Sequence, residues 1–349
     1  MVAASRTWLR EPMRVTGIRP IAARWLLALF VAAVVAGALV GGPGASLGDR
    51  DHAAVVAAMR DDSDYYRLIG GIVPAGAFAG RLIPPPTLAL IESAMGPLGA
   101  TILLCGVLAG ILLVGWDRLT ELFADASGRL LGAAMLLGGT TVGALLAIVE
   151  PHGGWAALLA AWSLLLRRRG RWVEAAAIAC AAGTIEPGAT LLAIVMAGTA
   201  WIDGERREAI GWSAAAPVAA ACWLAHRVAL AGLGIGSIGE GAAPAPFDVA
   251  AAALLPGAPA WLGGALLITG IAGWSVVRGD LARRVSALVL AGLLLAHAPG
   301  MLWAAVLTTP LLPLGLIFAA SAAITLVRAE GTRRRITVTR VRQAERSDA

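Results

Sequence analysis

Long apolar runs alternate with short charged segments along the chain. The runs hold about 15 to 25 residues, mostly Ala, Leu, Val, Ile and Gly, and lack the strict alternation of polarity that marks the strands of a membrane barrel. A helix crosses the hydrocarbon core of a bilayer with about 20 apolar residues. Because lipid leaves backbone polar groups without water, only helices or closed barrels span it. The pattern therefore predicts an all-α fold, a polytopic transmembrane helical bundle.

The lengths of the runs predict about ten spans. Two runs are too long for one crossing at about 1.5 Å per residue and must fold back, one at Glu150-Pro151-His152-Gly153-Gly154 and one at Glu186-Pro187-Gly188. Each of these hairpins contributes two crossings or none, so eight spans is the main alternative. The first expected span is 25–42, and the second follows an apolar helix to Met95 and ends near Gly115. Residues 130–166 and 172–203 are expected to form one hairpin each. The remaining expected spans are 210–229, 261–277, 285–302 and 305–327.

The chain is expected to form one integral membrane domain, residues 1–349, in which polar segments separate the spans. A basic cytoplasmic N-terminus is expected over 1–24 and a basic cytoplasmic tail over 328–349. A first periplasmic loop is expected over 43–86, containing short helices that lie at the membrane surface, and a second long periplasmic loop over 231–260. No convincing small-x-small cleavage site follows the basic N-terminal segment, so the first helix is expected to be retained.

The distribution of arginine supports this threading. All 28 basic residues are Arg, and with ten spans all of them fall on one side except Arg50, Arg60, Arg67, Arg81 and Arg227. An excess of basic residues marks the cytoplasmic side. Absence of Lys and abundance of Ala and Gly are typical of GC-rich bacterial genomes. We therefore expect a multi-pass protein of the bacterial inner membrane with both termini cytoplasmic.

Composition agrees with a membrane protein and argues against a soluble enzyme. Hydrophobic residues make up 58% of the chain and charged residues only 14%, whereas soluble domains carry about 25% charged residues. The net charge of +6 comes from short clusters between apolar runs, which are topology signals, so no nucleic-acid partner is expected. Membrane lipid is the expected partner. Oligomeric state is left open.

Acids and histidines outside the basic loops gather on the expected periplasmic side. The densest group is Asp61-Asp62-Ser63-Asp64-Tyr65-Tyr66, followed by Arg81 and the run Pro84-Pro85-Pro86-Thr87, which leads into an apolar helix. His152 and Glu186 lie at the two predicted outer turns. An ionisable residue at membrane depth is a functional candidate.

This order of features resembles the N-terminal part of the GT-C superfamily of polytopic glycosyltransferases, which includes protein O-mannosyltransferases and the aminoarabinose transferase that acts on lipid A. Those proteins have an acidic residue after the first span, a nearby Tyr and a Pro-Pro-Leu-like start to the next helix. The resemblance covers about residues 25–115. Plain turns at Gly153-Gly154 and Pro187-Gly188 mark a diverged member.

The resemblance implies that a sugar is transferred from a polyprenyl-phosphate donor to a periplasmic or lipid acceptor. A carboxylate would accept the proton of the acceptor hydroxyl, for which Asp64, Asp62 and Asp61 are the candidates. Positive charge would bind the donor phosphate, for which Arg81 and Arg67 are the candidates. The further substrate-binding candidates are Tyr66, His152 and Glu186. The cofactor is unknown, and a divalent metal bridged by the aspartates is one option.

Other interpretations of the same residues stay open. The aspartates are also suited to capping surface helices, and Tyr65-Tyr66 to anchoring the chain at the membrane interface. Short helices flanking Glu186 are also typical of transporter sites. A transporter or lipid-handling permease, or a non-catalytic membrane scaffold of the same fold, is therefore the alternative function.

Overall fold

The computed structural model describes residues 9–10, 13–40, 50–61, 64–72, 83–235, 246–255, 257–295 and 301–331. Over these ranges the chain is helical and contains no strand, which confirms the all-α prediction. The elements are α1 (Pro20–Val40), α2 (Arg50–Arg60), α3 (Tyr65–Ile72), α4 (Thr87–Leu122), α5 (Ala126–Val149), α6 (Pro151–Leu166), α7 (Val173–Ile185), η2 (Pro187–Ala189), α8 (Thr190–Ile202), α9 (Arg206–Gly232), α10 (Pro246–Leu254), α11 (Ala260–Val276), α12 (Asp280–Leu295), η3 (Leu302–Val306) and α13 (Leu312–Gly331).

Five of these helices, α1, α4, α5, α9 and α13, are long and apolar enough to cross a membrane. The other predicted spans correspond to shorter helices. α6 has 16 residues, while α7 and α8 have 13 each, so they are about 24 Å and about 20 Å long. Several apolar helices of this kind are compatible with a membrane protein, and length alone leaves the number of crossings open.

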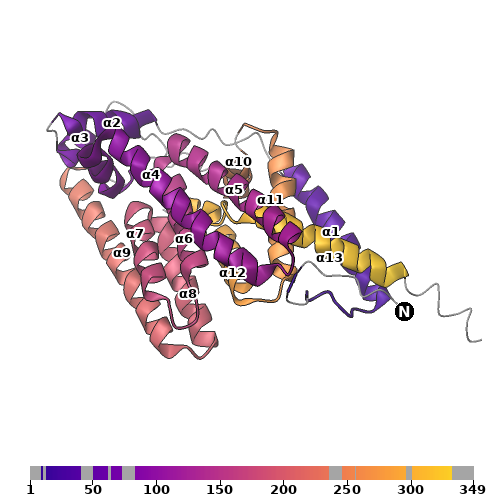
Figure 1. Cartoon of the computed structure of the whole chain (residues 1–349). Coiled ribbons are helices and arrows are strands. Elements are labelled where there is room, and N and C mark those ends of the chain that lie inside the picture. The colour runs from indigo at the N-terminus through magenta and orange to yellow at the C-terminus, as the bar shows by residue number, and fades with distance from the viewer. Residues whose placement is uncertain are drawn as a thin grey trace, which may run out of the picture.

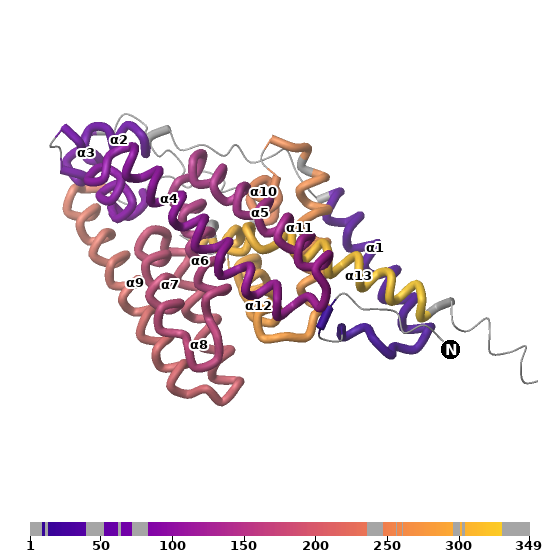
Figure 2. Tube along the Cα trace, viewed as in Figure 1, coloured from indigo at the N-terminus to yellow at the C-terminus, as the bar shows by residue number. Residues whose placement is uncertain are grey.

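The helix ends collect on two faces of an elongated bundle (Figure 1). One face, here called the arginine face, holds the ends of α4, α6 and α8 and the starts of α9 and α12, joined through Arg118, Arg167 and Arg284. The other, the histidine face, holds α2, α3, the start of α4, the α5–α6 turn and the end of α9, joined through His52, His152 and His226 (Figure 2). Successive helices from α4 to α9, the short ones included, therefore run in opposite directions between the two faces.

Small residues let α1, α11 and α13 pack closely. A Cβ added at Gly37 of α1 would overlap Gly264 of α11, and one added at Gly273 of α11 would overlap the carbonyl oxygen of Gly315 in α13. Close backbone approach of this kind replaces the hydrophobic effect as the source of helix association in lipid. The first helix is thereby fixed to helices from the end of the chain.

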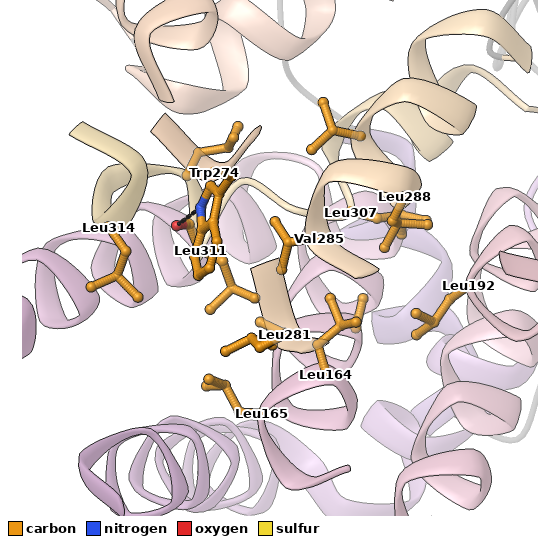
Figure 3. Packing of buried hydrophobic residues seen from close by; sticks show 14 of the residues in the cluster. Leu164, Leu165, Leu192, Trp274, Leu281, Val285, Leu288, Leu307, Leu311 and Leu314 are labelled. Atoms are coloured by element: carbon orange, nitrogen blue, oxygen red, sulfur yellow. Dashed lines mark hydrogen bonds between the residues drawn. The ribbon is translucent and has the colours of Figure 1, made fainter. Parts of the chain in front are cut away.

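Several of the sequence-based bounds need correction, and two of these lie at segments that contain proline. The reversal predicted over 150–154 occurs at Glu150 alone, because Pro151 is preset for the first helical turn and Gly154 permits contact with the Ala147 backbone of α5. The span expected at 305–327 begins only at Leu312. Pro310 has no N–H to continue a helix, and the indole N–H of Trp274 donates to the Leu311 carbonyl at 2.9 Å (Figure 3).

α6 lies at the centre of the bundle and is buried along nearly its whole length. Leu164 of α6 belongs to one apolar core with Leu192 of α8, Val285 of α12 and Leu307 after η3 (Figure 3). α6 is thus surrounded by protein, whereas α4 and α9 each expose an apolar face.

The arginine face is held by a buried ion-pair network. Arg167 follows α6, is 1% exposed, and donates through Nε and Nη2 to both carboxylate oxygens of Glu208 in α9, at 2.7 and 2.8 Å. It also pairs with Asp280 at the start of α12. Paired geometry of this kind is the strongest form of an arginine–carboxylate contact. These arginines are therefore part of the fold.

Arg284 of α12 extends the network to the loop between α8 and α9. It is 1% exposed, donates to the Thr199 hydroxyl at 2.6 Å and pairs with Asp203 at 3.1 Å. Arg283 also pairs with Asp203 and, mainly through this hydrogen bond, lowers the pKa of the Asp203 carboxyl. The ends of four helices are thereby joined.

Candidate functional site

α2 and α3 form a small layer over the start of α4 and the end of α9. Val55 and Val56 of α2, Tyr65 and Ile69 of α3 and Leu230 of α9 are buried together in a separate apolar cluster. Each helix thus turns an apolar side inward and charged residues outward, as expected for surface helices.

Two tyrosines of α3 hold the residues that precede α4. The Tyr65 hydroxyl donates to the Pro84 carbonyl at 2.6 Å, and the Tyr66 hydroxyl lies 3.2 Å from Nδ1 of His226 in α9. Nε2 of His226 lies 3.1 Å from the Ile83 carbonyl, which can only accept. His226 therefore carries its proton on Nε2 and accepts from Tyr66 on Nδ1, so both ring nitrogens are engaged.

Burial, and secondarily the charge of Asp64, raise the pKa of Tyr66. The phenol is thus kept in its protonated form, which is the form that donates to His226. This agrees with a positioning role for Tyr66, since a neutral hydroxyl supplies a hydrogen bond and no charge.

A second contact joins α2 to α4 and α6. Nε2 of His52 in α2 lies 2.9 Å from the Glu92 carboxylate in α4, and the His52 ring meets the ring of His152 edge to face, with centroids 4.8 Å apart. His52 is 5% exposed and His152 is 6% exposed. Polar side chains from three helices therefore meet beneath the α2–α3 layer.

His152 occupies the first turn of α6. Its Nε2 is buried and has no hydrogen-bond partner among the residues that the structure describes. A buried polar atom without a partner costs about 1–3 kcal/mol, so such an atom in a folded protein calls for an explanation.

Two buried carboxylates lie at the neighbouring turns. Glu150 separates α5 from α6 and is 5% exposed, while Glu186 lies at the apex of the α7–α8 hairpin and is 6% exposed. The Glu186 carboxylate accepts from the Gly188 N–H at 3.2 Å and lies near enough to Glu150 for the two acids to interact. Gly188 packs on Ala304 of η3, so this apex is inside the protein.

The predicted site residues are dispersed over this region. Asp64 is exposed and accepts from the Arg67 N–H at 3.0 Å, which is the contact of a helix N-cap. Asp61 and Arg67 are exposed, and Tyr66 is half-buried. Of the candidates, His152 and Glu186 are buried. The Tyr66 hydroxyl contacts the buried ring of His226. Asp62 and Arg81 lie outside the described residues.

Glu92 was not predicted as a site residue. The sequence did contain a signal for this residue, because Glu92 is the only acid between Thr87 and Trp116. An acid in an apolar run at membrane depth indicates function. His52 and His226 were visible as polar residues, but their convergence depends on the fold of α2 and α9 onto α4.

Over the described ranges, no group of three or more His, Cys, Asp or Glu side chains is placed to hold a metal ion. Comparison of the chain with models of known protein families, with curated proteins and with solved structures finds no match.

Proposed function

We propose that this chain is a membrane glycosyltransferase that transfers a sugar from a polyprenyl-phosphate donor to a hydroxyl acceptor at the histidine face. The observation that carries the proposal is the buried polar group formed by His52, Glu92 and His152 beneath α2 and α3. The GT-C-like order of Asp61 to Tyr66 and Pro84 to Thr87 supports it.

The surroundings suit a substrate that is polar at one end and apolar along its length. Leu90 and Leu98 of α4 and Leu224 and Val228 of α9 are exposed, on the two helices that flank the polar group. A polyprenyl chain would lie against such faces, while its head group would lie near α2 and α3. Arg67 and Arg81 remain the proposed partners of the donor phosphate.

We propose a ten-span topology with the histidine face periplasmic and the arginine face cytoplasmic. The alternating direction of successive helices supports it, because every additional crossing returns the chain to the opposite face. The short helices α7 and α8 would then cross only where the surrounding protein supplies polar contacts, as irregular membrane segments do.

The transfer assay tests the proposed function directly. Membranes that overproduce the chain are incubated with radiolabelled polyprenyl-phosphate sugars, and labelled lipid and protein products are separated. We expect product above that of membranes from cells without the chain. Glu92→Gln should lower the rate, because it removes the charge paired with His52.

Glu121→Gln is the matched control, since Glu121 lies on the same helix at the arginine face and its side chain is 49% exposed. It should leave the rate unchanged. No transfer from any donor, or equal rates for both variants and the wild-type chain, would contradict the proposal.

A permease is the second candidate, favoured by the burial of Glu186 between two short helices. Broken helices with an ionisable residue at the break are typical of transport sites. In that case purified protein in vesicles should move a lipid-linked or polar solute, and Glu186→Gln should stop this movement. In a glycosyltransferase the same variant would change transfer instead.

A further inference from the structure

A cavity lies at the arginine face, where three parts of the chain meet. It holds about 170 Å³ and is lined by the end of α4, by residues 277–282 between α11 and α12, and by Leu9 of the N-terminal segment. One water molecule needs about 10–15 Å³ of such space, whereas drug-sized ligands fill about 300–1,000 Å³. The cavity therefore fits a group of several heavy atoms, such as a phosphate.

The N-terminal segment joins the helix ends that form the other walls. The N–H of Arg10 donates to the Leu122 carbonyl at the end of α4 at 3.0 Å, and the N–H of Arg14 donates to the Val276 carbonyl at the end of α11 at 2.9 Å (Figure 2). Backbone hydrogen bonds on two sides therefore hold the cavity in shape.

Arg118 of α4 lines the cavity with only part of its guanidinium engaged. Its Nε donates to the Leu165 carbonyl and its Nη1 to the Glu121 carboxylate, each at 2.7 Å. Its Nη2 has no acceptor among the described residues. Two contacts thus orient the side chain, and two N–H groups are left for the oxygens of an anion.

Arg278 supplies a second cation from the turn between α11 and α12. It lines the cavity, is exposed, and forms no ion pair with any residue that the structure describes. Asp280, on the same stretch, has a side chain that is 44% exposed. The cavity is therefore open to solvent on this side.

Two acids also line the cavity, and both are paired with arginines. Glu121 pairs with Arg118 and Arg168, and Asp280 with three further arginines. The members of this paired cluster are Arg118, Arg167, Arg168, Arg283 and Arg284 with Glu121, Asp203, Glu208 and Asp280. Five arginines thus face four acids, and Arg278 adds one more positive charge. An anion in the cavity would neutralise this excess.

The position of the cavity favours a lipid as the source of the anion. Trp116, two residues before Arg118, is 44% exposed, as is typical of aromatic residues at the membrane interface. Leu113, one turn earlier on α4, is 71% exposed, and Leu122 and Leu281 line the cavity itself. A phospholipid would place its phosphate between the arginines and its acyl chains along α4.

We propose that this cavity binds the phosphate of an anionic phospholipid, with Arg118 and Arg278 as its cationic contacts. The inference is independent of sugar transfer, because the cavity lies at the arginine face and the polar group of the proposed function lies at the histidine face. A bound lipid would hold the end of α4 to the α11–α12 turn.

Lipid binding to the full chain tests this proposal. The chain is purified in detergent, dioleoyl phosphatidylglycerol is titrated, and bound lipid is counted by native mass spectrometry. Arg278→Gln should weaken binding about 5-fold, as expected for the loss of one arginine beside an anionic lipid. The midpoint of thermal unfolding without lipid should not change, because Arg278 is exposed and unpaired among the described residues.

Arg207→Gln is the matched control. Arg207 lies at the start of α9 on the same face, is exposed and forms no ion pair within the described ranges, but it does not line the cavity. Its loss should change binding less than about 2-fold, below the effect of one arginine at a lipid phosphate. Equal weakening in both variants, or none in either, would overturn the proposal, because binding would then depend on the surface as a whole.

Two further probes identify the source of the phosphate. Dioleoyl phosphatidylcholine has the same acyl chains but no net charge, and it should bind at least about 5-fold more weakly. Glycerol 3-phosphate has no acyl chains, and at the same concentration it should leave bound phosphatidylglycerol in place. Equal binding of the two lipids would overturn the role of the arginines, and displacement by glycerol 3-phosphate would overturn the lipid as the ligand.

Discussion

A single carboxylate or imidazole has a different meaning when it is exposed and when it is buried. Asp64 precedes α3, faces solvent and caps that helix, whereas His152 belongs to the polar group beneath α2 and α3 and is enclosed. An exposed cap contributes about 1 kcal/mol to its helix. An enclosed imidazole nitrogen that finds no partner among the described residues instead costs about 1–3 kcal/mol.

Asp64→Asn tests the assignment of Asp64. Asn caps helices about as well as Asp, so the fold of α3 is preserved and only the charge is lost. The sequence-based hypothesis, in which Asp64 is the base, expects a loss of about 10²- to 10⁴-fold. Because Asp64 is exposed and caps α3, we expect transfer within about 2-fold of the wild-type rate, less than the effect of losing a general base.

Asp61→Asn, measured in the same transfer assay, is the companion variant, because Asp61 is also exposed. If either substitution abolishes transfer, the aspartate hypothesis is correct and the capping role is not the whole role of these residues.

The sequence predicted which types of residue to examine and could not rank them. His152 and Glu186 were visible because each follows or forms a break in an apolar run. Their burial depends on η3 and on α2, which come from distant parts of the chain. Glu92 was overlooked because one acid in a long apolar run has little effect on its overall hydropathy.

At the scale of helices, apolar run length and proline position predicted most elements. The breaks at Glu150 and Glu186 coincide with helix ends, and Gly96, with a φ of +70°, separates the apolar helix to Met95 from the following span. α4 continues to Leu122, beyond the predicted end at Gly115. Leu119 is buried there and Arg118 pairs with Glu121 one turn on, contacts that hydropathy does not register.

The ion pairs of the arginine face make a prediction about stability. Glu208→Gln removes the negative charge that pairs with Arg167. The guanidinium stays buried, because Arg167 is only 1% exposed. Breaking a buried pair in this way costs about 3–5 kcal/mol. We expect a clear fall in the midpoint of thermal unfolding in detergent, measured by the loss of monodisperse protein on heating.

Glu205→Gln is the matched control. Glu205 pairs with Arg169, whose side chain is 75% exposed, so the change should cost less than about 1 kcal/mol. A Glu208→Gln variant as stable as Glu205→Gln would show that the network at the arginine face contributes nothing to the fold.

At the scale of the whole molecule, the alternation of helix direction agrees with the distribution of arginine. The sequence predicted a side for each charged segment, and the fold places Arg118, Arg167, Arg283 and Arg284 on one face. What the sequence could not provide is the relation among helices. The contact of α1 with α11 and α13 depends on glycines that carry no distinct signal in a glycine-rich chain.

Cysteine labelling tests the sidedness of these faces. In a chain with Cys105, Cys180 and Cys222 replaced by Ala, a cysteine at position 67 should react with a membrane-impermeant maleimide in intact cells lacking an outer-membrane barrier. A cysteine at position 169 should react only after the membrane is opened. Arg67 and Arg169 are both exposed, so access to solvent is matched.

Labelling of position 169 from outside, or of position 67 only from inside, would contradict the proposed orientation. Labelling of both positions from the same side would contradict the odd number of crossings that ten spans require between them.

The pairing of α1 with α11 and α13 has a consequence for how the protein is made. The amide of Arg14 donates to the Val276 carbonyl at 2.9 Å, and Gly37 meets Gly264. Helices leave the ribosome in chain order, so α1 is complete long before its partners, because more than two hundred residues separate it from α11. α1 is long and apolar enough to cross a membrane by itself, which suits it to that interval without its partners. Completion of the bundle is therefore a late event in translation, and a chain stalled before α11 would leave its first helix without a partner.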